Sequence, residues 1–241
     1  MFVEEPLRTL RTSLEGARIV AFTGAGISSE SGIPTFRGAG GLWRNFSAER
    51  LATPEAFASD PRLVWEWYDW RRQIIRKAEP NAGHRALVEI ERRAREPFTL
   101  VTQNVDGLHD RAGSQNVVKL HGDIWRVRCV GCGAEQRNEQ VPMEPLPPHC
   151  SCGALLRPAV VWFGETLPQD AWDQALAAAR RAQVFLVVGT SALVYPAAAL
   201  VMLARQSGAR VAIVNPDRTP ADELADWILR GPAGEILPRL L

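Results

Sequence analysis

Five short apolar runs in this chain predict buried β-strands that lie side by side. They are rich in β-branched and aromatic residues and cover residues 19–23, 98–102, 117–120, 184–188 and 211–214. Segments with helical character separate them, and this alternation is typical of a parallel, doubly wound α/β sheet. Several runs end in glycines or small polar residues, and the carboxyl ends of parallel strands meet along one edge of a sheet. We therefore expect one ligand site along that edge.

The first run leads into a glycine-rich turn. Gly24 and Gly26 flank Ala25, and residues that can begin a helix follow from Ser28 to Ser31. Because glycine has no Cβ, a phosphate can approach this backbone, and the N-terminus of the helix would face the same anion. The third glycine of the usual dinucleotide fingerprint is missing. The turn by itself is therefore as consistent with a plain tight turn as with a nucleotide site.

The segments between the runs predict helices. They cover residues 4–15, 54–78, about 84–95, 170–181 and 196–207, with a terminal helix over 221–228. Pro54 and Pro61 would lie in first turns, where proline is well tolerated. Residues 158–165 predict an extended apolar segment.

The composition favours one large domain, or a domain with a smaller insertion. The chain has 241 residues, 46% of them hydrophobic, and a net charge of +1. A nearly neutral chain argues against a dedicated nucleic-acid surface or a polybasic membrane surface. No apolar run is long enough to span a bilayer, and residues 1–16 do not resemble a secretory signal. We expect a cytoplasmic protein.

The four cysteines form two close pairs, which predict a metal site. Cys129 and Cys132 make the first pair, and Cys150 and Cys152 make the second. In a cytosolic chain this clustering favours tetrahedral Zn(II) over free thiols or disulfides. With four thiolate ligands there is no open coordination position. One structural zinc would therefore hold together a loop-rich module of roughly residues 126–157.

Other side chains are candidates for chemistry. Gln103, Asn104 and Asp106 follow the second apolar run, and His121 follows the third. A histidine there can titrate near neutral pH, although a structural hydrogen bond is the alternative. Tyr68 and Arg71 lie three residues apart and share a helix face. They can bind a carboxylate, or they can belong to a solvated face.

Taken together, these motifs resemble the sirtuins, which are NAD-dependent protein-lysine deacylases. The resemblance extends from about Leu14 to Leu237 and rests on Gly24–Ser28, Gly32–Arg37, Thr102–Asp106, His121–Gly122, the four cysteines and Gly189–Ser191. It implies a Rossmann-like large domain of about residues 1–38, 82–125 and 158–241. It also implies a small domain made of a helical module, about 39–81, and a zinc module, about 126–157.

The resemblance also implies site residues. Those for NAD are Gly24, Ala25, Gly26, Ser28, Phe36, Arg37, Gln103, Asn104, Val105, Asp106, Gly189, Thr190, Ser191, Asn215, Pro216, Asp217 and Ala233. The strip that pairs with the substrate backbone is Val160, Trp162, Phe163, Gly164 and Glu165. His121 would be the general base, with Asn104 and Asp106 holding the nicotinamide. The products would be free lysine, nicotinamide and 2′-O-acyl-ADP-ribose, and zinc would do no chemistry.

One feature resembles a subgroup of the family. Tyr68-x-x-Arg71 is similar to the signature of class III sirtuins, which remove succinyl and malonyl groups and bind the acyl carboxylate with this pair. Ala52 matches the small residue of their widened acyl pocket. We therefore expect removal of acidic acyl groups, with acetyl as a weaker or parallel substrate.

Three alternatives are compatible with parts of the sequence. They are a mono-ADP-ribosyltransferase, a non-catalytic NAD-sensing module and a zinc ribbon that binds nucleic acid. The arginines near the cysteines are few and alternate with Glu135 and Glu139, which disfavours the last of these. We expect a monomer that acts on acyl-lysine proteins and has no nucleic-acid site or membrane contact.

Overall fold

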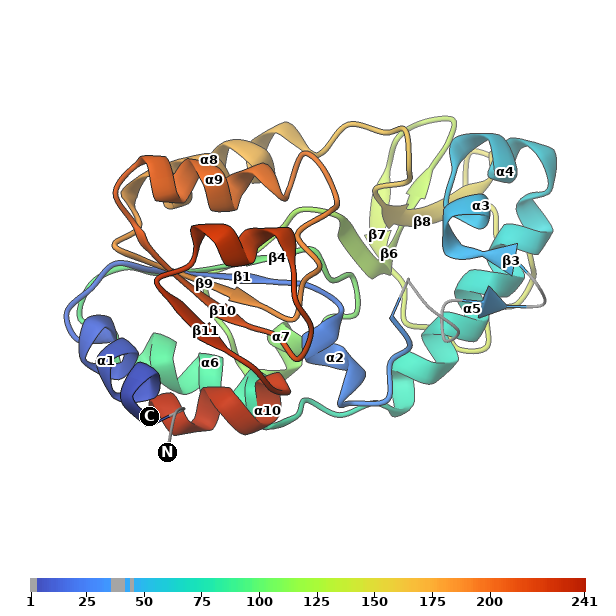
Figure 1. Ribbon diagram of the computed structural model, residues 1–241. Helices are drawn as coiled ribbons and strands as arrows, with labels where there is room; N and C mark the ends of the chain where they lie inside the picture. The colour runs from blue at the N-terminus through green and yellow to red at the C-terminus, as the bar shows by residue number, and fades with distance from the viewer. Residues whose placement is uncertain (1–3, 36–41, 44–45) are drawn as a thin grey trace.

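A parallel sheet of six strands forms the centre of the larger lobe (Figure 1). The computed structural model describes residues 4–35, 42–43 and 46–241. The strand order is β11-β10-β9-β1-β4-β5. The bounds are Ile19–Thr23 for β1, Phe98–Thr102 for β4, Val117–Lys119 for β5, Val184–Val188 for β9, Arg210–Val214 for β10 and Trp227–Leu229 for β11. This arrangement confirms the predicted doubly wound sheet.

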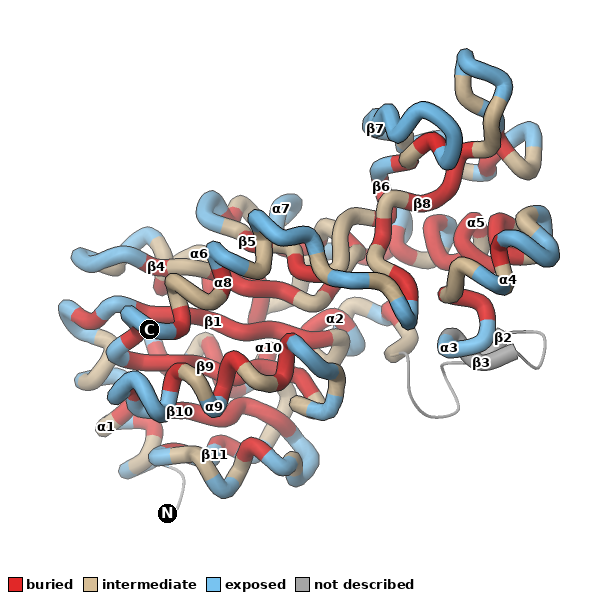
Figure 2. Tube along the Cα trace, turned by 90° about the horizontal axis from the view of Figure 1, so that it is seen from above, coloured by how far each residue is buried: buried red, intermediate tan, exposed pale blue. Residues whose placement is uncertain are grey.

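Helices cover both faces of this sheet (Figure 1). One face carries α1 (Glu4–Leu14), α6 (Ala82–Arg93), α10 (Ala233–Ile236) and the 3-10 turn η3 (Leu237–Leu240). The other carries α8 (Gln169–Arg181) and α9 (Ala199–Gln206). Successive residues of β1 alternate between the two cores, so Ala21 packs toward α6 and Phe22 toward α8 and α9. Every residue of β1 and β9 is therefore buried (Figure 2).

The smaller lobe combines helices with an antiparallel sheet of order β7-β6-β8. Its elements are α4 (Pro54–Ser59), α5 (Pro61–Lys77), β6 (Gly122–Cys129), β7 (Glu135–Arg137) and β8 (Leu156–Val160). Trp65 and Trp67 of α5 pack in one core with Val127 and Trp162. The helices and the cysteine-bearing segment therefore share a single core and stand beside the larger lobe (Figure 2). The residue ranges of the two modules remain a prediction.

Side-chain caps explain where the helices of the smaller lobe begin. Thr53 accepts a hydrogen bond from the N–H of Ala56 at the start of α4, and Asp60 accepts one from Leu63 at the start of α5. Pro54 and Pro61 lie in the first turns, as predicted. The remaining short elements are α2 (Gly26–Ser29), β2 (Leu42–Trp43), β3 (Phe46–Ser47), α3 (Ala48–Leu51), α7 (Leu108–Ala112) and the 3-10 turn η2 (Pro220–Leu224).

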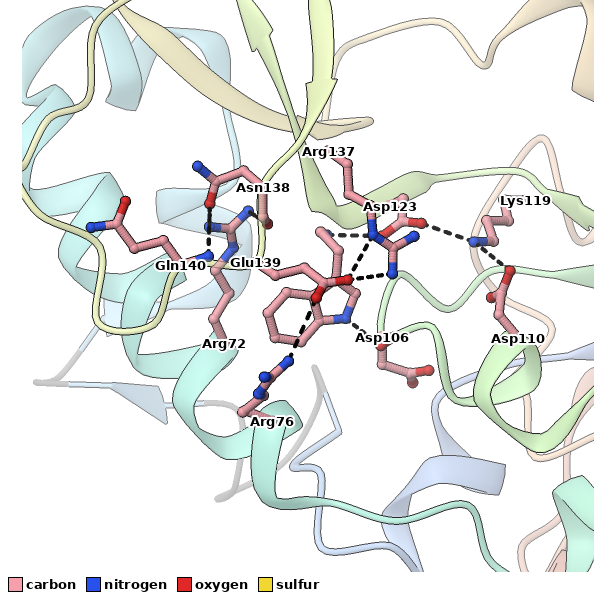
Figure 3. A network of polar contacts seen from close by, with 11 residues as sticks. Arg72, Arg76, Asp106, Asp110, Lys119, Asp123, Arg137, Asn138, Glu139 and Gln140 are labelled. Carbon is pink, nitrogen blue, oxygen red and sulfur yellow. Dashed lines mark hydrogen bonds and ion pairs between the residues drawn. The ribbon is translucent and has the colours of Figure 1, made fainter.

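A polar network within the smaller lobe extends to the larger lobe (Figure 3). Arg72 of α5 donates to the carbonyl oxygen of Ile124 in β6, with distances of 2.9 Å and 2.7 Å, and to Asn138 after β7. The indole of Trp125, also in β6, donates to the carbonyl oxygen of Asp106 at 2.9 Å. The smaller lobe is thus tied to the loop that follows β4.

One predicted element is wrong. Residues 221–228 do not form a helix, because the chain makes only η2 and then enters β11. There Trp227 pairs with Ala212, donates its indole N–H to Thr9 at 2.9 Å and lies under the guanidinium of Arg210. These contacts outweigh a weak helical pattern.

The helix after the glycine turn is the single turn α2, and Ser28 lies inside it rather than at its cap. Of the extended segment predicted for residues 158–165, only residues 158–160 belong to a strand, because β8 ends at Val160. Among the described helices, none has both the length and the apolar character needed to cross a membrane.

Candidate active site

A cavity of about 500 Å³ lies between the carboxyl edge of the large sheet and the smaller lobe. Loops after β1, β4, β9 and β10 form one side, and α5 with the segment after β8 forms the other. Of the predicted site residues, those that line it are Gly24, Ala25, Gly26, Ala52, Tyr68, Arg71, Gln103, Asn104, Val105, His121, Val160, Trp162, Phe163, Gly164, Glu165, Gly189, Thr190, Ser191, Asn215 and Asp217. The sheet edge predicted to bind a ligand is therefore the one that faces the cavity.

Six of the residues predicted to bind NAD do not line the cavity or cannot be placed. Ser28 and Asp106 lie directly behind its wall, and both are buried. Ala233 packs in the core beneath the sheet. Phe36 and Arg37 lie outside the described residues. Pro216 is also absent from the residues that form the wall of the described cavity.

Glycines allow the two central loops of the site to touch. A Cβ on Gly26 would lie 2.7 Å from the carbonyl oxygen of Gly189, and a Cβ on Gly24 would lie 2.7 Å from Cβ of Thr190. Gly189 has a φ of +57°, and a Cβ there would overlap the backbone nitrogen of Ile27. Bare backbone therefore faces the cavity from both loops, which suits an extended anionic ligand such as a dinucleotide. Loop–loop packing is a reason for these glycines that the sequence did not reveal.

A layer of buried polar side chains supports the loop after β4. Asn104 donates its side-chain N–H to the carbonyl oxygen of Gly24 at 3.1 Å and to Ser28 at 3.3 Å. The hydroxyl of Ser28 donates to Asp106 at 2.8 Å, and the other carboxylate oxygen accepts from the N–H of Leu108 at 2.8 Å. Burial raises the pKa of Asp106, although Leu108, Ser28 and Arg71 counteract it. Asp106 thus fixes the loop from behind.

Two buried histidines extend this layer, and sequence reasoning did not place them there. His109 lies 3.0 Å from the hydroxyl of Thr23, and His84 lies 3.4 Å from that of Ser28. Burial lowers the pKa of His84 to about 4 and that of His109 to about 3, so both rings are neutral at pH 7. The sequence did contain one indication for His109, because this residue follows Asp106 by only three positions.

The hydrogen bond between His121 and Gln103 decides which ring nitrogen of His121 can accept a proton. Nδ1 lies 3.0 Å from the carbonyl oxygen of Gln103, which can only accept a hydrogen bond. Nδ1 therefore holds the proton, and Nε2 keeps a lone pair. Burial lowers the pKa of His121, and the contact with Gln103 partly counteracts this. The ring is therefore neutral at pH 7 and can accept a proton.

Tyr68 and Arg71 share a buried position on α5. Tyr68 is 3% exposed and Arg71 is 7% exposed, and both line the cavity. This placement rules out the alternative that they form a solvated helix face. The hydroxyl of Tyr68 accepts a hydrogen bond from the indole of Trp162 at 2.9 Å. Burial raises the pKa of Tyr68 and lowers that of Arg71.

Two further chain segments line the cavity. The first is the predicted strip, where the N–H of Phe163 donates to the carbonyl oxygen of Ala52 at 2.9 Å. The carboxylate of Glu165 accepts two hydrogen bonds from Arg157, at 2.6 Å and 2.9 Å, so this side chain has an internal partner. The second is residues 194–196, which sequence reasoning missed and in which Tyr195 is 75% exposed.

The four cysteines come together, as predicted. Their sulfur atoms lie within 4.8 Å of one another, with Cys129 3.4 Å from Cys152 and Cys132 3.8 Å from Cys150. Tetrahedral zinc requires sulfur–sulfur separations of about 3.8 Å. The backbone N–H groups of Cys132 and Gly131 point at Cys129 and lower the pKa of its thiol to about 6. The cluster fits one structural zinc ion, and none of its residues lines the cavity.

Comparison with known proteins identifies the family. The sequence pattern of the Sir2 family matches residues 24–196. The chain belongs to this family, the sirtuins. An NAD-dependent protein deacylase of Aquifex aeolicus is 58% identical over 214 residues, which are 88% of this chain and 89% of that protein.

Solved sirtuin structures share the fold. A Sir2 homologue in complex with NAD superposes with a TM-score of 0.91 at 48% identity, over 97% of this chain and 91% of that one. A complex of Sir2 with a p53 peptide and NAD⁺ gives a TM-score of 0.87 at 34% identity, over 97% and 96%. The resemblance to the sirtuins and the fold predicted from the sequence are thereby confirmed. The roles of individual residues in this sirtuin remain predictions.

Proposed function

We propose that this sirtuin is an NAD-dependent protein-lysine deacylase. The observation that carries the proposal is His121, a neutral histidine with a fixed tautomer in the wall of the cavity. The glycine loops line the same cavity as the buried Tyr68 and Arg71. The homologues named NAD-dependent protein deacylase and the NAD and peptide complexes of Sir2 proteins support it.

NAD would be bound by the loops at the sheet edge. When bound, it supplies a nicotinamide that leaves and a ribose hydroxyl that receives the acyl group, so the products are nicotinamide and 2′-O-acyl-ADP-ribose. The backbone around Gly24–Gly26 and Gly189–Ser191 would hold the phosphates, with Asn215 and Asp217 toward the adenosine. Asn104 donates to Gly24 and Ser28, and we assign its Oδ1 atom to the nicotinamide half.

His121 would act as the general base. Nε2 would take the proton of a ribose hydroxyl, and the hydrogen bond from Nδ1 to Gln103 keeps the ring in the required orientation. Phe163 and its neighbours would pair with the backbone of the acyl-lysine protein by strand addition. The zinc cluster would support the smaller lobe and take no part in the transfer.

We further propose that acidic acyl groups are preferred. A phenol and a guanidinium line one cavity, and an arginine can bind a carboxylate through two parallel hydrogen bonds. Because both side chains are buried, the attraction for a carboxylate is stronger than on a solvated surface. Ala52 lines the same cavity with a small side chain.

Mass spectrometry of lysine peptides incubated with the protein and NAD tests both proposals. We expect removal of succinyl and malonyl groups to exceed removal of acetyl, with one nicotinamide released for each acyl group. Removal of acetyl alone would contradict the acyl preference and leave the deacylase intact. No removal of any acyl group would contradict the deacylase, and an added ADP-ribose mass on the protein or peptide would then indicate the transferase.

Substitution of the carboxylate-binding pair sharpens this test. Tyr68→Phe together with Arg71→Met should lower the ratio of desuccinylation to deacetylation by at least about tenfold, because hydrogen bonds to a charged group are lost. Arg76→Met is the matched control, since Arg76 lies on the same helix and faces Glu139 at 3.8 Å, outside the cavity. An unchanged ratio in the double variant would mean that the pair is structural.

We propose, finally, that the chain acts as a monomer in the cytoplasm and has no dedicated nucleic-acid site. Its net charge of +1 and its clustered cysteines, which lie in metal-site geometry, support this. Light scattering in solution should give the mass of one chain, 26.6 kDa. A mass of two chains would contradict the monomer.

A further inference from the structure

Trp162 connects Tyr68, in the wall of the cavity, to the partly buried ion pair of Arg157 and Glu165. It is 2% exposed, and its indole N–H lies 2.9 Å from the hydroxyl oxygen of Tyr68. The guanidinium carbon of Arg157 lies 3.3 Å from the centre of the indole ring. The guanidinium of Arg157 is held in turn by Glu165 and by the carbonyl oxygen of Val160. Phe57 also packs against the indole, with ring centres 5.3 Å apart.

These contacts leave Trp162 with one orientation. The indole contacts both Arg157 and Phe57, and Arg157 is fixed by three hydrogen bonds. An indole that cannot turn points its N–H in a constant direction. That direction is toward Tyr68.

The direction of this hydrogen bond determines what Tyr68 can do. An indole N–H only donates, so the oxygen of Tyr68 accepts. The hydroxyl proton of Tyr68 is therefore not used by Trp162 and remains available to an acceptor in the cavity that Tyr68 lines. Burial raises the pKa of Tyr68, so the proton is retained at neutral pH. A hydroxyl that already accepts one hydrogen bond is a stronger donor in the next.

We propose that Trp162 is a positioning residue for acyl specificity, whose indole N–H holds the hydroxyl of Tyr68 as a donor toward the carboxylate of an acidic acyl group. This inference rests on the proposed preference for acidic acyl groups. It assigns to the Trp162 side chain a task separate from the pairing of that segment with the substrate backbone. A purely structural tryptophan would use Tyr68 only to satisfy its buried N–H. Such a residue would not affect the choice between acyl groups.

The first test is Trp162→Phe, which removes the N–H and retains an aromatic ring. We expect the ratio of kcat/KM for a succinyl-lysine peptide to kcat/KM for the matching acetyl-lysine peptide to fall about tenfold, as for the loss of one oriented hydrogen bond to a charged group. The fall should arise mainly from a higher KM for the succinyl peptide. Replacing Trp162 by benzothienylalanine, which has sulfur in place of the N–H, should give the same fall while keeping the bicyclic shape.

Trp65→Phe is the matched control. Trp65 lies on the same helix as Tyr68, is fully buried and donates its indole N–H to the carbonyl oxygen of Leu156 at 2.7 Å. Its loss should lower the melting temperature and leave the ratio unchanged. A fall in the ratio as large as that of Trp162→Phe would show a general packing effect and overturn the proposal.

Tyr68→Phe separates this inference from the proposed function. We expect Tyr68→Phe to lower the succinyl-to-acetyl ratio of kcat/KM. When Trp162→Phe is added to Tyr68→Phe, we expect no further fall in this ratio. If Tyr68→Phe lowers the ratio and neither Trp162 variant does, the role of Trp162 is overturned and the acyl preference stands. If Tyr68→Phe leaves the ratio unchanged, the role of Trp162 is overturned, and the double variant of Tyr68 and Arg71 decides the acyl preference. An equal fall for Trp162→Phe with and without Tyr68 would also overturn the inference.

Discussion

His121 shows how one backbone atom can prepare a side chain for chemistry. The carbonyl oxygen of Gln103, one residue beyond the end of β4, holds the proton of the ring on Nδ1. The sheet therefore selects the tautomer before any ligand arrives. Burial also lowers the pKa of the ring, which favours the neutral, proton-accepting form.

The pH dependence of kcat/KM should reflect this environment. Because a general base must be neutral, activity falls as the pH drops through the pKa of His121. That pKa lies below its ordinary value of 6.5, so the midpoint of the acid limb should also lie below 6.5. His121→Ala should lower kcat/KM by about 10²–10⁴-fold and remove this limb. A midpoint above 6.5 would contradict the assignment.

Part of the cavity lining was predictable because strand ends in a parallel sheet have a predictable position, and the resemblance to the sirtuins supplied the rest of the predicted lining. Gln103, Asn104 and His121 follow their strands directly. The contact between Tyr68 and Trp162 was not predictable in this way, since the two residues are 94 positions apart. It exists because β8 and α5 pack in one core, which no local pattern encodes.

At the scale of elements, the contact between α6 and α7 buries two ionisable groups. The rings of His84 and His109 have centres 4.9 Å apart, and burial keeps both neutral. Charging either ring in the folded state would place a cation in the polar layer behind Asn104. These helices therefore make the stability of the large lobe sensitive to acid.

The free energy of unfolding should decrease as the pH falls below 6.5. Both folded pKa values, about 4 and about 3, lie below the ordinary value of 6.5, so the unfolded chain binds more protons in that window. Each ring should contribute roughly 1.4 kcal/mol per pH unit until its folded pKa is reached. Urea unfolding at pH 7 and pH 5 measures this. His109→Gln should reduce the dependence, and an unchanged slope would contradict the assignment.

The error over residues 221–228 has an explanation at the same scale. Trp227 is 5% exposed and pairs with Ala212 at the edge of the sheet. Charged Asp226 and Arg230 flank the three residues of β11, so the apolar run is short. Strands β1, β4, β9 and β10 have five residues each and were predicted because each coincides with an apolar run. β11 forms because β10 offers a free edge to pair with.

For the whole molecule, the cysteine cluster supports more than its own loops. Cys129 ends β6 and is 2% exposed within the core that also holds Trp65 and Trp67. The same strand carries Trp125, which contacts the loop of Asp106 (Figure 3). The spacing of the cysteines predicted the cluster, whereas the core shared by the two modules became visible only in three dimensions.

Loss of zinc should therefore affect stability and all acyl activities together. Elemental analysis should find one zinc per chain, and a strong chelator or Cys150→Ser should remove it. We expect a lower melting temperature and a similar loss of desuccinylation and deacetylation, because zinc binding contributes to folding. Added zinc should restore the chelated protein. A chain without zinc that melts at the original temperature would contradict the structural role.

The contact between the glycine loops has a consequence for redesign. The turn at Gly24–Gly26 and the turn at Gly189 fit together so closely that neither accepts one additional methyl group from the other side. Suppose that one of these turns is replaced by the corresponding turn of another dinucleotide-binding protein in order to change the cofactor preference. The new turn would then not fit the surface of the turn that was left in place. The two turns must therefore be replaced together, although 162 residues separate Gly26 from Gly189 in the chain.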